Sequence, residues 1–219
     1  ECCRNGLYDI TNAIQVAIEN NYSFKAIESD GKWMDIVYPW DLLDVNAKTL
    51  MNVSHSISGK IEENVVIKGN VFIEEDTIIH SGSYIIGPVT IGKNCEIGPN
   101  VCIFPSTSIG NNVMIHPFTQ IKNSIIMDNT IIDTHSIISN SVIGKGCSIG
   151  NHFSILLGRD IVKIEREYLE VENVGAFIGD GTYIRSNVAV YPAIRIGANC
   201  KIEAGRILRK DIRNGSWVV

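Results

Sequence analysis

The sequence has little that would indicate a zinc site, a membrane segment or a nucleic-acid-binding surface. Its six cysteines include no Cys-x-x-Cys pair and no cluster with histidine, which excludes the common zinc patterns. The sequence has no signal peptide and no apolar run long enough to span a membrane. The formal net charge is −5, whereas a nucleic-acid partner would favour a basic stripe. We therefore expect neither a membrane nor a nucleic acid as a partner.

The cysteines and the first residues carry two further expectations. Three of the cysteines, Cys95 among them, fall at positions that require a small side chain, which predicts buried free thiols and a reducing, cytoplasmic location. The chain begins with Glu1, and its first residues already have the pattern of a domain interior. We expect a fragment of a longer protein.

What the sequence does have is a strict repeat of six residues. Isoleucine occupies positions 61, 67, 73, 79, 85, 91, 97, 103, 109, 115 and 121, and a small or β-branched residue follows four places after nearly all of them. A period of six fits neither an α-helix nor an alternating strand, and it predicts a solenoid in which each hexapeptide forms one short strand and a turn. A sandwich of short strands is the alternative, but it predicts irregular spacing.

The repeat is interrupted twice. Between Ile121 and Ile143 the register slips, and the segment "SNS" shortens a turn before Ile143. A second strict run covers Ile178 to Leu208, and between the runs lies a charged segment, residues 156–177, without the period. We expect this segment to leave the solenoid as an extruded arm that serves a partner subunit or covers a ligand cleft.

The N-terminal segment has a different pattern. Residues 7–20 predict a helix, capped by Asp9 or Thr11, whose apolar face is formed by residues 13, 14 and 16–18. A short strand is expected over residues 23–29, then a turn, another strand and a helix capped near Asp41.

The order "YDITNAIQ", W-x-D, P-W-D-x-L over residues 7–46 resembles the end of a sugar-1-phosphate nucleotidyltransferase domain. "IGPVTIGKNCEIGPN", "NSVIGKGCSIG" and "GAFIGDG" resemble the left-handed β-helix of bifunctional enzymes that also acetylate amino-sugar 1-phosphates. The expected fold is thus mainly β: residues 1–58 are an α/β remnant of the nucleotidyltransferase domain, and residues 59–219 are a left-handed parallel β-helix of hexapeptide repeats.

The resemblance implies site residues. Asp35 of W-x-D would help to hold Mg²⁺ between the nucleotide and the sugar 1-phosphate in the full-length protein. In the acetyltransferase half, Lys122 would bind substrate and a histidine would be the general base. Counting back from Ser141 places that base on Thr134 and a family tyrosine on Ile137, with His135 one place late, so His135 is a candidate whose side chain could point elsewhere. The family's phosphate-binding arginine is replaced by Phe104.

Three functions stay open. In the first, the β-helix is a trimerisation or regulatory module of a nucleotidyltransferase. In the second, it is an acetyl-CoA-dependent N-acetyltransferase acting on an amino-sugar 1-phosphate, and Arg206, Arg209, Lys210 and Arg213 meet the CoA phosphates or are simply solvated. In the third, it is a purely structural hexapeptide protein, which the W-x-D and P-W-D motifs disfavour. A homotrimer is expected for the first two.

Overall fold

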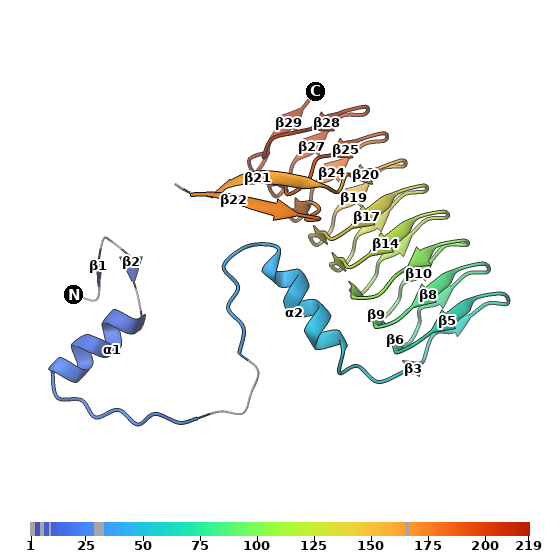
Figure 1. Cartoon of the computed structure of the whole chain (residues 1–219). Helices are drawn as coiled ribbons and strands as arrows, with labels where there is room; N and C mark the ends of the chain where they lie inside the picture. The colour runs from blue at the N-terminus through green and yellow to red at the C-terminus, as the bar shows by residue number, and fades with distance from the viewer. Residues whose placement is uncertain (1–2, 5–6, 9, 29–32, 165–166) are drawn as a thin grey trace. The chain divides into compact units, whose positions relative to one another are not determined.

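The computed structural model describes residues 3–4, 7–8, 10–28, 33–164 and 167–219. The chain divides into two compact units, residues 1–34 and residues 35–219. The second unit is a stack of coils, each with three short strands, and is shown in Figure 1. The expected β-helix is therefore confirmed.

Three parallel sheets run the length of the stack. Sheet 1 contains β3 (Ser56–Ile57), β6 (Val71–Ile73), β9 (Val89–Ile91), β12 (Thr107–Ile109), β15 (Ile125–Ile126), β18 (Val142–Ile143), β23 (Phe177–Ile178) and β26 (Arg195–Ile196). Sheet 2 contains β4 (Lys60–Ile61), β7 (Ile78–Ile79), β10 (Glu96–Ile97), β13 (Met114–Ile115), β16 (Ile131–Ile132), β19 (Ser148–Ile149), β24 (Tyr183–Ile184), β27 (Lys201–Ile202) and β29 (Trp217–Val218). Sheet 3 contains β5 (Val66–Lys68), β8 (Tyr84–Ile86), β11 (Cys102–Ile103), β14 (Gln120–Lys122), β17 (Ile137–Ser139), β20 (Ser154–Ile155), β25 (Ala189–Val190) and β28 (Ile207–Leu208). We call the turns from sheet 1 to 2, from 2 to 3 and from 3 to 1 the first, second and third corners.

The isoleucine column forms the core. Ile79 pairs with Ile97, and Ile97 pairs with Ile115, so one full coil is three hexapeptides. From Ile73 to Ile121 these side chains are at most 3% exposed. Their β-branched shape suits a strand, and each buried side chain stabilises the fold by about 1.5–3 kcal/mol. Cys95, Cys147 and Cys200 are free and at most 2% exposed, as expected, and burial raises the pKa of Cys95 and Cys147.

The third corner is shortened in two successive coils. Lys122 pairs with Ser139 and Ile125 pairs with Val142, a spacing of one residue less than a full coil. The inward isoleucines accordingly step from Ile121 to Ile126 as well as from Ile138 to Ile143. The sequence located only the second of these changes.

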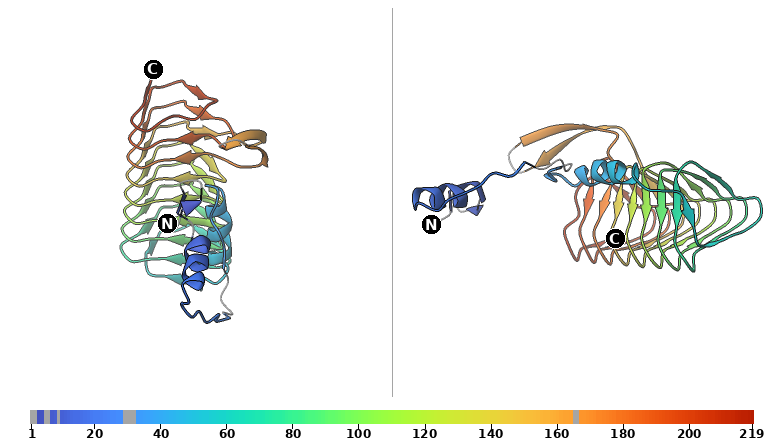
Figure 2. Two further views of the ribbon diagram at one scale, coloured as in Figure 1. Left: turned by 90° about the vertical axis from the view of Figure 1, so that its left-hand side faces the viewer. Right: turned by 90° about the horizontal axis from the view of Figure 1, so that it is seen from below.

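The next passage through the same corner contains a hairpin. Its strands β21 (Arg159–Ile164) and β22 (Glu167–Glu172) are antiparallel and form a sheet of their own. Figure 2 shows the hairpin and helix α2 (Asp41–Leu50) on the same side of the β-helix.

Helix α2 packs on the outer face of sheet 1. Leu43 is buried against Val142 and Phe177, and the Trp40 ring lies 6.4 Å from the Phe177 ring. Asn46 donates to the Ser106 carbonyl and accepts from the Ser108 hydroxyl. This helix thus belongs to the compact unit that contains the β-helix.

Residues 1–34 contain strands β1 (Cys3–Arg4) and β2 (Leu7–Tyr8) and helix α1 (Ile10–Glu19), which has no buried residue. Thr11 lies within the first turn of α1, and Asp9 is outside the described residues. The strands expected over 23–29 and before α2 are absent from residues 23–28 and 33–37, because a strand needs a partner for its backbone hydrogen bonds. Asp41 begins α2, but its carboxylate accepts the N–H groups of Val37 and Tyr38 in the preceding turn instead of capping the helix.

Candidate active site

The second corner places His135 between two other rings. Phe118, His135 and His152 occupy the same position in successive coils, all with positive φ. The ring centroids of Phe118 and His135 are 5.0 Å apart, and those of His135 and His152 are 5.1 Å apart. This separation follows from the roughly 4.8 Å spacing of paired strands. The imidazole of His135 is exposed at its edge and covered on both faces.

A threonine contacts the edge of the same imidazole. The Thr134 hydroxyl oxygen lies 2.7 Å from Nδ1 of His135 and 2.7 Å from the carbonyl oxygen of Pro117. The Pro117 carbonyl also accepts the backbone N–H of His135 at 3.1 Å. The previous coil therefore holds both residues, and the turn keeps the His135 side chain on the outside of the corner.

Two further histidines begin this corner in earlier coils, each directly after a strand of sheet 2. His116 lies 4.0 Å from Asp133. His80 lies between Glu62 and Glu96, with nitrogen–oxygen distances of 3.1 and 3.0 Å. Partial burial disfavours the charged imidazole of His80, but the hydrogen bonds to Glu96 and Glu62 outweigh this, so the pKa of His80 is raised. A shallow groove of about 230 Å³ lies between His80, Glu96, Met114 and His116.

Lys122 is exposed at the opposite edge of sheet 3 from His135. It is paired with Ser139, the last residue of β17, and His135 lies four residues earlier, in the turn before this strand. At about 3.3 Å per residue, this places the two positions about 13 Å apart along the sheet. One chain therefore does not bring Lys122 and His135 together.

Asp35 is exposed in the irregular segment before α2. Among the described residues there is no group of three or more His, Cys, Asp or Glu side chains that could hold a metal ion. The described residues thus do not form a magnesium site on their own. Of the basic residues near the end of the chain, Arg209 stacks on Tyr191 at 4.8 Å, and all four are exposed.

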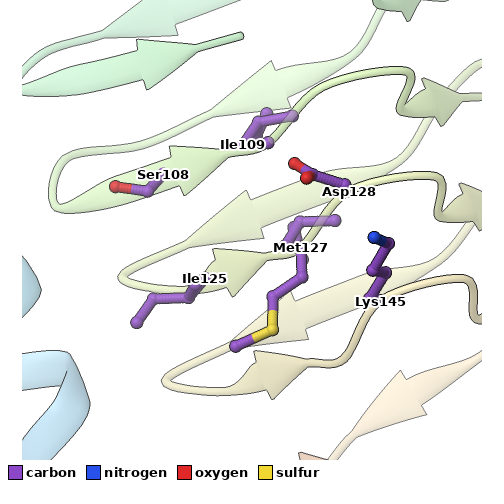
Figure 3. Close-up of a pocket in the computed structure, with 8 residues that line it drawn as sticks. Ser108, Ile109, Ile125, Met127, Asp128 and Lys145 are labelled. Atoms are coloured by element: carbon purple, nitrogen blue, oxygen red, sulfur yellow. The ribbon is translucent and has the colours of Figure 1, made fainter. Parts of the chain in front are cut away.

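A second cavity, of about 320 Å³, lies at the first corner beside sheet 1. In Figure 3, Met127 lies between Ile125 on one side and Asp128 and Lys145 on the other, and Ser108 and Ile109 belong to the neighbouring coil. In four coils this corner has a glycine after the sheet-1 isoleucine, and an Asn or Asp of the next coil accepts the N–H that follows the glycine. Met127 and Lys145 replace the glycine and the acceptor, so the cavity marks a break in this pattern.

The sequence predicted His135 as a candidate base but did not predict the side chains around it. Phe118, His135 and His152 are spaced 17 residues apart, one shortened coil, and this spacing was a visible signal in the sequence. The contact between Thr134 and His135 could not be predicted, because it depends on the left-handed backbone conformation of this turn.

Comparison with known proteins finds relatives among the enzymes that the sequence resembles. Residues 85–174 match the family described as the GMPPB C-terminal domain, and residues 175–210 match the hexapeptide repeat of succinyl-transferase. The chain is 44% identical to the bifunctional protein GlmU of Methanococcus maripaludis, over 97% of this chain and 53% of that protein. It is 38% identical to the bifunctional sugar-1-phosphate nucleotidylyltransferase/acetyltransferase of Sulfurisphaera tokodaii, over 97% of this chain and 55% of that protein.

The predicted resemblance to bifunctional transferases is thus confirmed, and the chain spans about half the length of the curated relatives it matches. Among solved structures, the UDP-N-acetylglucosamine O-acyltransferase of Moraxella catarrhalis has a TM-score of 0.46 and 17% identity, over 73% of this chain and 66% of that chain. Within the described part of the chain, no helix has the length and apolar character needed to cross a membrane.

Proposed function

We propose that the chain is part of a bifunctional enzyme of nucleotide-sugar biosynthesis and that its β-helix transfers acetyl groups from acetyl-CoA to an amino-sugar 1-phosphate, with His135 as general base. The observation that carries this proposal is the imidazole of His135, which is held on both faces and at one nitrogen at an exposed corner. The named activities of the relatives support the reaction class.

Counting back from Ser141 places the base of the resemblance on Thr134, one place before His135. A neutral imidazole can accept a proton from an amine near neutral pH, whereas a threonine hydroxyl cannot. The Thr134 hydroxyl contacts Nδ1 of His135 at 2.7 Å. His135 is therefore the proposed base.

In the reaction, the amine nitrogen attacks the thioester carbonyl carbon, a C–N bond forms and the C–S bond breaks. His135 accepts the proton from the nitrogen and returns it to the leaving thiolate, so the products are the N-acetyl sugar phosphate and CoA. No charge is left on the protein at the end of the cycle.

The test is an assay of the purified chain with acetyl-CoA and glucosamine 1-phosphate. We expect turnover that falls by about 10²–10⁴-fold in His135→Ala. His80→Ala, at the same corner in an earlier coil, is the matched control and should retain the activity. Absence of turnover in the wild-type chain under conditions where it is folded and trimeric would overturn the proposal.

A homotrimer is the second part of the proposal. Exposed apolar side chains flank His135 on both sheets: Met114 and Ile131 on sheet 2, Phe118 at the corner and Ile137 on sheet 3 are 36–55% exposed. A second copy that covers this edge would also allow its Lys122 to approach His135. Light scattering should give the mass of three chains, and Ile131→Glu with Ile137→Glu should give one chain. A wild-type protein that is monomeric at assay concentrations would contradict the trimer.

The nucleotidyltransferase role is proposed for the whole protein. There Asp35 would supply one ligand of a magnesium ion, and the other ligands would come from substrate phosphates and from residues outside this chain. If the β-helix has no acetyltransferase activity but forms the trimer, it serves as the assembly module of that enzyme.

A further inference from the structure

We propose that Thr134 is a positioning residue that fixes the tautomer of His135, with the proton on Nδ1 and the lone pair on Nε2. The catalytic meaning of this inference rests on the proposed function, but the tautomer itself does not. Thr134 is the residue one place before the proposed base, and its hydroxyl is shared between two neighbours.

The assignment follows from the number of protons available. A threonine hydroxyl has one proton to donate and two lone pairs to accept with. The Pro117 carbonyl oxygen, 2.7 Å away, can only accept, so the hydroxyl proton points to it. The oxygen of Thr134 must then accept at the 2.7 Å contact with His135, and Nδ1 must carry a proton.

The neighbouring rings hold the imidazole in the orientation that this contact requires. Phe118 covers one face at 5.0 Å and His152 covers the other at 5.1 Å. Among the described residues, no hydrogen-bond partner contacts Nε2 of His135, and the side chain is exposed. Nε2 is therefore the nitrogen that faces a substrate.

The same contact suits both protonation states of a general base. The imidazolium and the neutral ring each have a proton on Nδ1, so the hydrogen bond to Thr134 persists while Nε2 gains and loses a proton. A base that keeps its orientation through the cycle needs no reorganisation between the attack of the amine and the departure of the thiolate. This is the same logic by which a third group orients the base in hydrolytic triads.

The first test reads the tautomer directly. In the full chain labelled with ¹⁵N-histidine, the ¹⁵N resonances of His135 are assigned by their loss in His135→Gln. Above the titration range of the ring, we expect Nδ1 to be protonated and Nε2 to be unprotonated in the wild type. Thr134→Ser should preserve this state, and Thr134→Val should shift the population towards the Nε2–H form. A wild-type ring protonated mainly on Nε2, or no change in Thr134→Val, would overturn the proposal.

The second test reads the consequence for catalysis. Thr134→Val should lower kcat about tenfold with little change in KM and should shift the acidic limb of the pH–rate profile, which reports deprotonation of the general base, whereas Thr134→Ser should restore both. Thr134→Val with wild-type kcat would overturn the positioning role. If the tautomer is as expected but the wild type transfers no acetyl group, the proposed function fails and the tautomer assignment stands.

Discussion

The first and second corners of the β-helix use the same left-handed turn with different side chains. At the first corner the positive-φ residues are all Asp, Asn or Gly: Asp76, Asn94, Asn112, Asn129, Gly146, Gly181, Asn199 and Gly215. At the second corner Asn64, Gly82, Asn100, Asn187 and Gly205 follow this rule, and Phe118, His135 and His152 do not. Left-handed backbone is costly for most side chains other than Gly, Asn and Asp, and such strain is concentrated at functional sites. The three successive positions that carry Phe or His instead of Asn or Gly thus coincide with the candidate site.

The first corner is also where side chains satisfy the backbone most regularly. Asn94 donates to Asn112, and Asn112 donates to Asn129, which forms a ladder along the stack. The Asx acceptors described above occupy the space left by the glycines. This corner stabilises the coil, whereas the second corner presents imidazoles to solvent.

The largest effect is expected where a side chain is added at the first corner. A Cβ on Gly110 would lie 2.3 Å from Oδ1 of Asp128 and 2.8 Å from its backbone nitrogen. Gly110→Ala should therefore lower the free energy of unfolding by about 3 kcal/mol, through overpacking and loss of the hydrogen bond from the Asn111 N–H. Gly146→Ala is the matched control, because a Cβ there meets nothing within 4 Å and only the φ of 66° is unfavourable. It should cost about 1–2 kcal/mol in urea denaturation, and equal losses would contradict the steric explanation.

Two substitutions should restore the glycine–Asx pattern that is missing at Met127 and Lys145. Alone, Lys145→Asn would bring an amide oxygen towards the Met127 Cβ, at a position where the glycines of four other coils leave only 2.3–2.6 Å. Combined with Met127→Gly, the new Asn can accept the Asp128 N–H as in those coils. The two substitutions should show a favourable coupling of about 1 kcal/mol in a double-mutant cycle of unfolding free energies. Additive effects would show that the glycine and the Asx residue contribute independently to the free energy of unfolding.

Two substitutions at the second corner should separate stability from activity: one introduces Asn where Phe is present, and the other introduces Phe where Asn is present. Phe118 is 55% exposed, so Phe118→Asn loses little buried surface and relieves its φ of 61°. The free energy of unfolding should stay constant or rise by up to about 1 kcal/mol, while acetyl transfer falls because the His135 ring loses one stacked neighbour. Asn100→Phe, one coil earlier, should be destabilising by a similar amount. A Phe118→Asn protein with full activity would show that the stack has no role.

The fold could be predicted because the isoleucines that form its core repeat every six residues. An inward isoleucine every six residues admits one arrangement of three-sided coils, and Ile97 or Ile103 could be placed in the core from the sequence alone. The packing of α2 on sheet 1 was not predictable, since it depends on outward side chains such as Val142 and Phe177, which share no period with the core. The strand expected over residues 23–29 is absent from residues 23–28, because a strand needs a partner for its backbone hydrogen bonds and the sequence does not specify one.

The sequence predicted one residue of the candidate site but not the contacts around that residue. His135 could be named as a candidate from the resemblance, but its position at the second corner, between the rings of Phe118 and His152, came only from the structure. The count from Ser141 falls on Thr134, and in the structure the hydroxyl of Thr134 contacts the neighbouring imidazole of His135. This contact depends on the left-handed turn at His135 and on the Pro117 carbonyl of the previous coil, which the sequence alone does not specify.

The smallest expected effect concerns His80, the other histidine of the second corner with a strong polar contact. Hydrogen bonds to Glu96 and Glu62 raise its pKa above the ordinary value of 6.5 in the folded chain. The folded state therefore binds the proton more tightly than the unfolded state, and this contribution to stability is complete below pH 6.5 and is lost as the pH rises through the raised pKa. Because the group is partly exposed, solvent screens the interaction and the effect is small. Urea midpoints measured between about pH 6 and pH 9 should fall more steeply in the wild type than in His80→Gln. Glu96→Gln, which leaves only Glu62 as a charged partner, should give an intermediate slope, and three equal slopes would show that the ion pairs of this corner do not contribute to its stability.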